Sequence, residues 1–439
     1  MQSVQFLSAM DRLISRRELS QLCAQHAPRA RTRPKLSAEQ LVSGLVFHQL
    51  QPSGTLAQHA AQLHGIRMSD SAYAQRRALL PVELFDQIMS TALQPLAKRA
   101  EQPESFYEDY RLVGVDGTQW SVTNTPAILE QLSKAASRRL QAAFAKLRLV
   151  CAVELGTHAP VAAVAAAASE GEQTLARSLW RRIPEGSLVI ADRLFGTACT
   201  LSEALRESEG RNVAFLVRVR DNIGASVERH LPDGSAIVQV AVREGHRISG
   251  QLRLRELRAT GVGLNGEPFT LRLWTTLMDA KRYPAETLGH QYVQRWEHEL
   301  YYRELKLDVR SAGVLASHTV ESALQEIAAL VLASAVVARL RVQCAQRLDV
   351  PVRRLSFFKL LLATRDLWNT FQLLGHLLTP TQQRHAWQQY LERVRYSALL
   401  PERRARSCPR VLRQPVSKWP RKTDQPSYTG EVQIKLVRV

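Results

Sequence analysis

Apolar residues recur at intervals of three to four positions along the first hundred residues, a spacing that predicts helices. The stretch LSAEQLVSGLVFHQL shows it most clearly, and Ser37 with Gln40 has the spacing of a capping box at the start of that helix. Basic residues lie between the expected helices at 28–35 and again at 75–77. We interpret this part of the chain as a small helical module with cationic turns.

Alternating and continuous apolar runs replace the helical spacing from about residue 106 onward. The order of the expected elements is strand, strand, strand, helix, strand, helix, strand, which predicts a mixed sheet with helices on its faces. The third strand is rich in alanine, so a helix is the alternative there. The strands are expected at 110–122, 147–155, 158–169, 187–192 and 212–220, and the helices at 171–183 and 196–208.

Residues 221–285 interrupt this rhythm with a β-rich insertion. Three strands are expected at 235–242, 246–257 and 269–278, separated by turn sequences such as PDGS and LNGEP. A long helix follows at 286–307.

The segment at 319–348 is apolar on most faces and is therefore expected to be a buried helix. From residue 401 the chain is expected to be loop-like and basic.

The chain carries 59 Lys and Arg residues against 40 Asp and Glu residues, a formal charge of +19. This excess favours attraction to polyphosphate, although an anionic membrane surface would be attracted by the same positive charge. The five cysteines are scattered and odd in number, which argues for a reducing compartment and against a zinc site. No run of eighteen apolar residues or signal peptide is evident, so we expect a cytoplasmic protein without a membrane segment.

Two aspartates follow apolar strands of the expected sheet. Asp116 follows LVGV and Asp192 follows LVIA, and carboxylates at the ends of buried strands converge at one edge of a sheet. Divalent cations that activate water at a phosphodiester need such oxygen ligands. Each aspartate has an alternative interpretation, because Asp116 with Gly117 fits a hairpin turn and Asp192 with Arg193 fits an ion pair or the start of a helix.

The helix at 286–307 carries a narrow stripe of polar side chains. At about 100° per residue, five side chains fall on one face: Tyr292, Arg295, Glu299, Arg303 and Lys306. Glu297 and Glu304 lie more than about 100° away, so this geometry selects Glu299 from the three acids. For a lone helix, a solvated face with an ion pair between Glu299 and Arg303 is the favoured alternative.

The spacing Tyr292-x2-Arg295-x3-Glu299-x6-Lys306 resembles the Y-R-E-K signature of the IS-four family of bacterial DDE transposases. VDGTQW resembles the motif around that family's first aspartate, and ADRLF resembles the motif around its second. The basic stretch PRVLRQPVSKWPRK and the segment DSAYAQRRALLP are similar to the C-terminal and N-terminal regions of its members. The resemblance therefore extends over most of the chain.

The resemblance implies an α/β, RNase H-like core in which Asp116, Asp192 and Glu299 bind two Mg²⁺ ions, with Mn²⁺ as a substitute. It further implies contacts with DNA phosphates, for which the candidates are Tyr292, Arg295, Arg303, Lys306 and Arg193.

Family members can carry a tryptophan in the insertion that stacks on a flipped base. Trp274 is the candidate, but a core tryptophan within a strand is the better interpretation. His298 lies on another face from Glu299, and we interpret it as structural.

With this frame the chain divides into five parts. They are an N-terminal helical DNA-binding domain (1–100), the first part of the catalytic core (101–220), the β-strand insertion (221–285), the second part of the core (286–345), and a C-terminal helical region with a basic tail (346–439). A solvated arginine-rich helical domain is the alternative for the first part.

The expected activity is cleavage at the inverted-repeat ends of a mobile element, followed by transfer of the 3′ hydroxyl into target DNA. The expected partners are double-stranded DNA and a second copy of the chain in a synaptic complex, in a bacterial cytoplasm. Two alternatives remain, namely an RNase H-like nuclease without strand transfer and a non-catalytic DNA-binding relative.

Overall fold

The computed structural model divides into two compact units. Unit 1 comprises Met1–Pro184 and Glu297–Leu399, and unit 2 comprises Glu185–Trp296 and Leu400–Val439. The structure describes residues 4–28, 34–135, 142–245, 247–262, 268–310, 313–401, 406–407, 428–429 and 433–437. The contacts thus divide the chain near residues 184 and 296, and not near residue 100, because the N-terminal helices share their core with a later helix.

The N-terminal part of unit 1 is helical, as its apolar spacing predicts. The capping box is confirmed, since Ser37 N donates to Gln40 Oε1 (3.0 Å) and Gln40 N donates to Ser37 Oγ (3.3 Å). The helices are α1 (Val4–Asp11), α2 (Arg16–His26), α3 (Ala38–Gln49), α4 (Leu56–His64), α5 (Asp70–Ala78) and α6 (Val82–Ala92). Of the basic stretch at 28–35, residues 29–33 lie outside the described residues.

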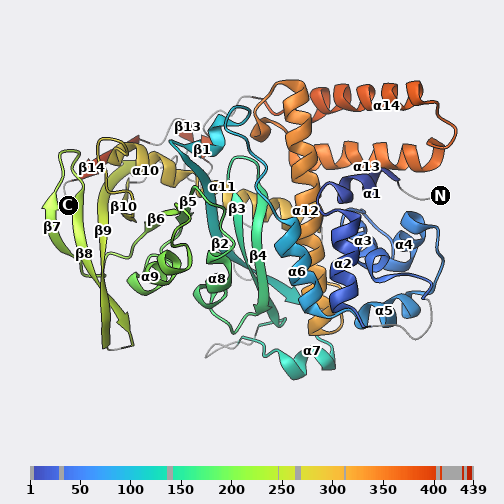
Figure 1. Ribbon diagram of the computed structural model, residues 1–439, viewed down its shortest axis with the longest axis horizontal. Helices are drawn as coiled ribbons and strands as arrows, with labels where there is room; N and C mark the ends of the chain where they lie inside the picture. Colours follow the sequence, from blue (N-terminus) through green and yellow to red (C-terminus); the bar gives the residue numbers. More distant parts are fainter. Residues whose placement is uncertain are drawn as a thin grey trace. The chain divides into compact units, whose positions relative to one another are not determined.

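Helix α12 (Val320–Leu348) is the core helix of unit 1. It packs against α3 and α6, as Figure 1 shows, and also against strand β4 (Ala159–Ala167). By length and composition α12 could cross a membrane, but 89% of its apolar window is buried within the protein. The expectation of a buried helix is confirmed.

Arg77 is a structural residue in this core, contrary to the interpretation of residues 75–77 as an open cationic turn. It lies on α5, where its guanidinium is buried and donates to Gln325 Oε1 (2.8 Å) and Ser317 Oγ (3.2 Å). Arg76 is partly exposed and lies within hydrogen-bond distance of the Leu36 carbonyl. Only part of that cationic segment therefore faces solvent.

The sheet of unit 1 has the strand order β4-β3-β2. Strands β2 (Tyr110–Val122) and β3 (Lys146–Glu154) are antiparallel, as are β3 and β4, so the alanine-rich segment is a strand. Short strands β1 (Phe106–Tyr107) and β11 (Val314–Leu315) pair with the two ends of β2. Helix α7 (Pro126–Gln131) lies between β2 and β3, and α8 (Glu172–Trp180) packs on β3 and β4.

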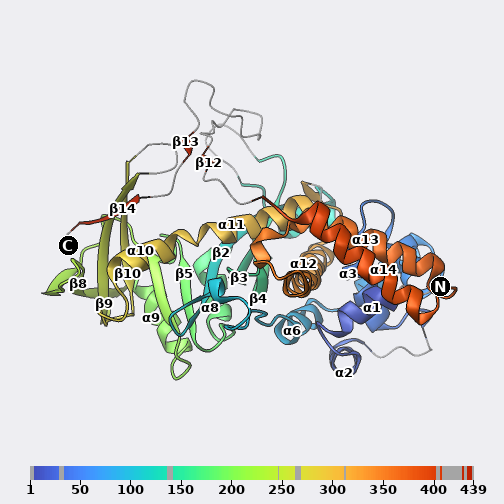
Figure 2. The same ribbon diagram turned by 90° about the horizontal axis from the view of Figure 1, so that it is seen from above.

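The C-terminal helices of unit 1 form a hairpin. Helices α13 (Phe357–Leu374) and α14 (Pro380–Arg393) run side by side, as Figure 2 shows, and α13 also packs against α12. The helical region expected after residue 346 is therefore present. The basic stretch PRVLRQPVSKWPRK lies outside the described residues.

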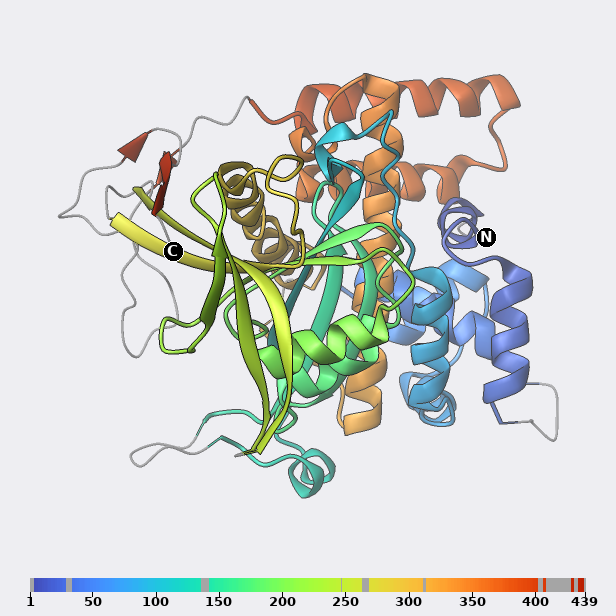
Figure 3. The ribbon, with the colours of Figure 1, turned by 60° about the vertical axis from the view of Figure 1, so that its left-hand side comes forward.

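Unit 2 contains a mixed sheet of strand order β5-β6-β10-β9-β8-β7, with β14 added to β9. β5 and β6 are parallel and the other neighbours are antiparallel; the long strands β8 and β9 are drawn in yellow-green in Figure 3. Each expected strand is present, and β7 and β14 are additional. Because β14 lies in the C-terminal tail, the expectation that the chain is loop-like from residue 401 is wrong for this segment. The elements are β5 (Ser187–Ala191), α9 (Ala198–Glu207), β6 (Ala214–Arg218), β7 (Ser226–His230), β8 (Ala236–Glu244), β9 (Arg247–Val262), β10 (Pro268–Thr275), α10 (Ala285–Val293) and β14 (Gln433–Val437).

Trp274 belongs to the core of this sheet. Its side chain is fully buried in β10, and its indole N–H donates to Glu256 Oε2 at 2.9 Å. The same carboxylate oxygen accepts a hydrogen bond from Arg272 at 2.8 Å. The interpretation of Trp274 as a core residue is confirmed.

Candidate active site

Asp116 lies in the middle of β2, where it pairs with Cys151 of β3. The predictions that it ends a strand or begins a hairpin turn are both wrong, because β3 pairs with β2 continuously from Val113 to Ser121. Gly117 has a different role from that of a turn residue. A Cβ there would lie 2.4 Å from Cδ of Glu172, so the glycine permits the close approach of that side chain.

The backbone of Asp116 is tied to the helix that carries Glu299. The hydroxyl of Tyr302, on α11 (Trp296–Arg303), donates to the Asp116 carbonyl at 2.6 Å and accepts from Cys151 N–H at 3.2 Å. Asp116 Oδ1 accepts the N–H of Gly117 at 2.8 Å. Glu299 lies one turn before Tyr302 on α11 and is partly exposed, as is Asp116.

The predicted single helix at 286–307 is interrupted. α10 ends at Val293, and Gln294 and Arg295 donate to carbonyls three residues earlier, which tightens the chain before α11 begins. A π-helical turn, η2 (Glu304–Val309), then follows α11 directly. One angle of about 100° per residue therefore does not hold from Tyr292 to Lys306, and the stripe is a composite of three segments.

Lys306, on η2, contacts β2 close to Asp116. Its ammonium donates to Thr118 Oγ1 and to the Gln119 carbonyl (3.0 Å), and it lies 5.5 Å from the centre of the Trp120 ring. Burial, and then the nearby charge of Lys146, lower the pKa of Lys306. Lys306 therefore fixes the helical segment on β2 as well as supplying a positive charge.

Arg303 is exposed, and among the described residues no ion pair joins it to Glu299. The alternative of an ion pair between these two side chains is therefore wrong.

Glu297 and Glu304 belong to a buried network of hydrogen bonds and ion pairs. Nε2 of His158 lies 3.0 Å from Glu297 Oε2, and Nδ1 of His158 lies 2.8 Å from Glu304 Oε2. Arg341 of α12 pairs with Glu304 at 3.2 Å, and Arg353 pairs with Glu297 at 3.4 Å. The two acids that flank Glu299 are thus committed to the protein interior.

His158 was missed by the sequence reasoning, and its backbone explains its placement. It has φ of 58° in the turn between β3 and β4, a left-handed conformation that turns its side chain toward Glu297 and Glu304. Burial alone would lower the pKa of His158, but the charge of Glu304 and the hydrogen bonds that the ring donates to both glutamates raise it. Burial would raise the pKa of Glu304, but His158 and Arg341 lower it. The network therefore contains an imidazolium between two carboxylates.

His298 is structural, as expected. Its ring is fully buried, and Nε2 lies 3.1 Å from the Cys151 carbonyl.

Asp192 directly follows β5 in unit 2, as the sequence predicts. Its Oδ1 accepts the N–H of Leu194 at 2.8 Å, and its carbonyl accepts the N–H of Phe195 at 3.1 Å, so Asp192 opens a tight turn. The cap of the following helix is Thr197 and not Asp192. Asp192 is partly exposed and Arg193 is exposed.

Tyr292 and Arg295 also lie in unit 2, whereas Asp116, Glu299, Arg303 and Lys306 lie in unit 1. Tyr292 is buried and Arg295 is partly exposed. Among the described residues, no group of three or more histidine, cysteine or carboxylate side chains is arranged to hold a metal ion.

Comparison with known proteins gives similarities to transposases. Over 80% of this chain and 78% of the relative, the sequence is 24% identical to the transposase InsG for insertion sequence element IS4 of Escherichia coli K12. It is 33% identical over 28% of the chain to the putative transposase InsZ of the same organism, covering 40% of that protein. A solved structure of a piggyBac transposase synaptic complex with hairpin DNA matches with a TM-score of 0.44 and 11% identity, over 90% of this chain and 85% of that one.

A family model described as the transposase DDE domain matches residues 107–336, a range that contains Asp116, Asp192, Glu299 and Lys306. This range is more than half of the chain. The protein therefore belongs to the family of DDE transposases, as its IS-four-type motifs predicted.

Proposed function

We propose that this transposase cleaves DNA at the inverted-repeat ends of its element and transfers the freed 3′ hydroxyl into target DNA. In this proposal Asp116, Asp192 and Glu299 act together on an RNase H-like core. The observation that carries the proposal is the bond from Tyr302 to the Asp116 carbonyl, which ties the strand of the first acid to the helix of Glu299. The burial of Glu297 and Glu304 against His158 supports the choice of Glu299.

The three acids fit the requirements of Mg²⁺, or of Mn²⁺ in its place. Both ions prefer oxygen ligands, and Asp116, Asp192 and Glu299 are each partly exposed, so a hydrated ion can reach them. Two ions per site, when bound, supply activation of the attacking water and stabilisation of the leaving 3′ oxygen.

The cations around these acids would hold the DNA strand in line with the carboxylates. Exposed Arg303 and Arg193 are suited to phosphate contacts, because an unburied guanidinium donates two parallel hydrogen bonds to phosphate oxygens. Lys306 adds charge from a fixed position on β2. We assign the same role to Arg295, which is partly exposed, but not to Tyr292, because its side chain is buried.

The partners are double-stranded DNA at the element ends and at the target. Because two ends must be cut and joined together, we propose that two copies of the chain form the synaptic complex on DNA. The formal charge of +19 supports a salt-dependent DNA affinity.

The test is strand cleavage and joining on labelled end-containing DNA with Mg²⁺ or Mn²⁺. Asp116→Asn, Asp192→Asn and Glu299→Gln should each lower the rate of cleavage by at least about a thousandfold, because each removes a charge needed at the reacting phosphate. Glu83→Gln, which changes an exposed acid on α6, is the matched control and should cleave normally. Full activity in any of the three variants would refute the assignment of that residue, and cleavage without joined products would limit the protein to a nuclease.

A further inference from the structure

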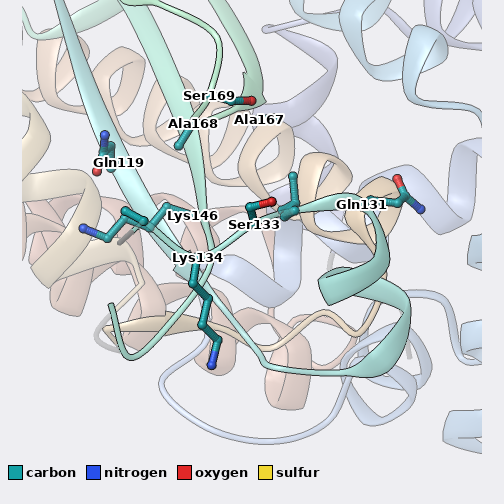
Figure 4. A pocket seen from close by; sticks show the side chains of 10 residues that line it. Gln119, Gln131, Ser133, Lys134, Lys146, Ala167, Ala168 and Ser169 are labelled. Atoms are coloured by element: carbon teal, nitrogen blue, oxygen red, sulfur yellow. The ribbon is translucent and has the colours of Figure 1, made fainter. Parts of the chain in front are cut away.

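A polar pocket of about 340 Å³ opens in unit 1 beyond the Lys306 end of the candidate site. Gln119 of β2 and Lys146 of β3 line one part of it, and Ala167 and Ser169 line another at the end of β4. The segment that follows α7, which carries Lys134, closes the remaining side, and Figure 4 shows the lysines on these separate segments.

The pocket is cationic. Two lysines line it, Lys134 and Lys146, and none of its lining residues is acidic. Among the described residues, no carboxylate forms an ion pair with either lysine. The two lysines give the lining of the pocket a net positive charge, which favours an anion.

Lys306 connects the pocket to the candidate active site. Its ammonium donates to the carbonyl of Gln119, whose side chain lines the pocket. The positive charge of Lys146 also lowers the pKa of Lys306. Gln119 lies three residues along β2 from Asp116, which is about 10 Å at the rise of a β-strand. Because side chains alternate along a strand, the side chain of Gln119 lies on the opposite face of the sheet from that of Asp116.

The lining chemistry is that of a phosphate site. Ammonium groups, the hydroxyls of Ser133 and Ser169, and the amide of Gln119 all donate hydrogen bonds to phosphate oxygens. The pocket is open to solvent on one side and contains no aromatic residue, so it offers no platform for stacking a base. The backbone of a strand suits it better than a base does.

We propose that this pocket binds a backbone phosphate of the DNA, away from the cleaved phosphodiester, through Lys134 and Lys146. The inference rests on the proposed function, because it takes DNA as the ligand of the protein. Its role is to set the path of the strand, and neither lysine takes part in the chemical step.

The first test compares two double variants of the full-length protein on end-containing DNA. Lys134→Gln with Lys146→Gln removes the pocket charges, and Lys98→Gln with Lys359→Gln removes two exposed lysines of unit 1 as a matched control. The slope of log affinity against log salt should fall by about 0.9 in the pocket variant relative to the control, as expected for one lost phosphate contact. Equal slopes in the two variants would overturn the proposal.

The second test locates the phosphate on the DNA. Single methylphosphonate substitutions, which remove one phosphate charge at a time, are scanned along the strand near the cut. One position away from the cut should weaken wild-type binding on the order of tenfold and leave the pocket variant unaffected. A scan in which every position affects both proteins equally would contradict the proposal.

A third measurement uses the wild-type protein, so that it does not depend on how the variants fold. Acetylation of lysines, followed by mass spectrometry, should show that end-containing DNA protects Lys134 and Lys146 but not Lys359. Protection by inorganic phosphate at the same phosphate concentration, without protection by DNA, would overturn the proposal in favour of a small-anion site. If the wild type never cuts DNA but both lysines are protected, the proposed function fails and the DNA contact stands.

Discussion

Nδ1 of His158 lies 2.8 Å from Oε2 of Glu304, and both side chains are buried. Nε2 of the same ring lies 3.0 Å from Glu297, so both ring nitrogens face carboxylates. Both nitrogens can donate only when the ring is charged, which agrees with the raised pKa of His158. Because Glu297 and Glu304 lie on either side of Glu299 in sequence, this one imidazolium fixes the segment that carries the candidate catalytic acid.

Replacing His158 by glutamine should destabilise unit 1 strongly. Two buried carboxylates would each lose their contact with the charged ring, and breaking such a buried network costs about 3–5 kcal/mol. Urea denaturation gives the free energy of unfolding of the variant and of the wild type. A loss below about 1 kcal/mol would show that the two acids do not depend on His158.

The same network should make stability depend on pH. The folded pKa of His158 is raised, so its contribution is fully present below about pH 6.5 and is lost as the pH rises through the folded pKa. The difference in unfolding free energy between wild type and His158→Gln should therefore shrink as the pH is raised from about 6 to about 9. A difference that stays constant over that range would mean that His158 does not change its proton occupancy on unfolding.

Replacing Tyr302 by phenylalanine should lower cleavage more than its cost in stability explains. The change leaves the Asp116 carbonyl and the Cys151 N–H without their hydroxyl partner, at a cost of about 1–3 kcal/mol, and loosens the strand of Asp116. Tyr301→Phe is the matched control, because that buried hydroxyl bonds to the side chains of Ser334 and Cys151, whereas the hydroxyl of Tyr302 bonds to the backbone of Asp116 and Cys151. Both variants should lose stability, whereas only Tyr302→Phe should slow cleavage of end-containing DNA under conditions where both are folded. Equal cleavage rates would show that the bond is purely structural.

Much of the fold could be predicted from local pattern. The capping box of Ser37 and Gln40, the order of strands and helices, and the buried helix α12 all depend on residues close in sequence, and all are present. Asp116 with Gly117 shows where the local pattern fails. The same dipeptide suits a turn or a strand that must accept a close neighbour, and only the position of Glu172, far along the chain, decides between them.

The candidate site was less predictable, because its surroundings are built from distant segments. Nothing near Glu299 in the sequence shows that His158 lies between Glu297 and Glu304. The break before α11 was also hidden, since residues 286–307 contain no proline and keep helical spacing throughout. The helix stripe thus selected Glu299 on the assumption of one regular helix, which the structure replaces with three segments. The Y-R-E-K spacing, which selects the same residue, does not depend on that assumption.

Arg303 and Lys306 should respond differently to replacement by alanine. Arg303 is exposed, so its loss should change the unfolding free energy by less than about 0.5 kcal/mol and reduce the salt slope of DNA binding by about 0.9. Lys306 holds Thr118 and the Gln119 carbonyl, so its loss should also lower stability, by about 1 kcal/mol. Thermal melting and salt-dependent DNA binding measure the two effects. A Lys306 variant that melts like the wild type would contradict the structural half of its role.

Arg77 and Arg76 offer a similar contrast in the N-terminal helices. Arg77→Met should lower the unfolding free energy by about 3 kcal/mol or more, because the buried Gln325 and Ser317 lose a charged donor. Arg76→Met, on the more exposed side of α5, should lower stability less and weaken DNA binding if this helix contacts DNA. Urea denaturation and fluorescence anisotropy with end-containing DNA separate the two. A large stability loss in Arg76→Met alone would reverse the assignment.

Trp274 should affect stability and leave the DNA products unchanged. Trp274→Phe keeps most of the apolar volume but removes the indole N–H that donates to Glu256. Burial would raise the pKa of the Glu256 carboxyl, but the hydrogen bonds from Arg272 and Trp274 lower it. Losing a hydrogen bond to a charged group costs about 1.5–3 kcal/mol, which denaturation should detect. Because the side chain is fully buried in β10, a flipped base cannot stack on it without opening the sheet. At a temperature where both proteins are folded, the cleavage products on end-containing DNA should therefore match those of the wild type. A selective loss of hairpin ends in the variant would show that Trp274 reaches the DNA.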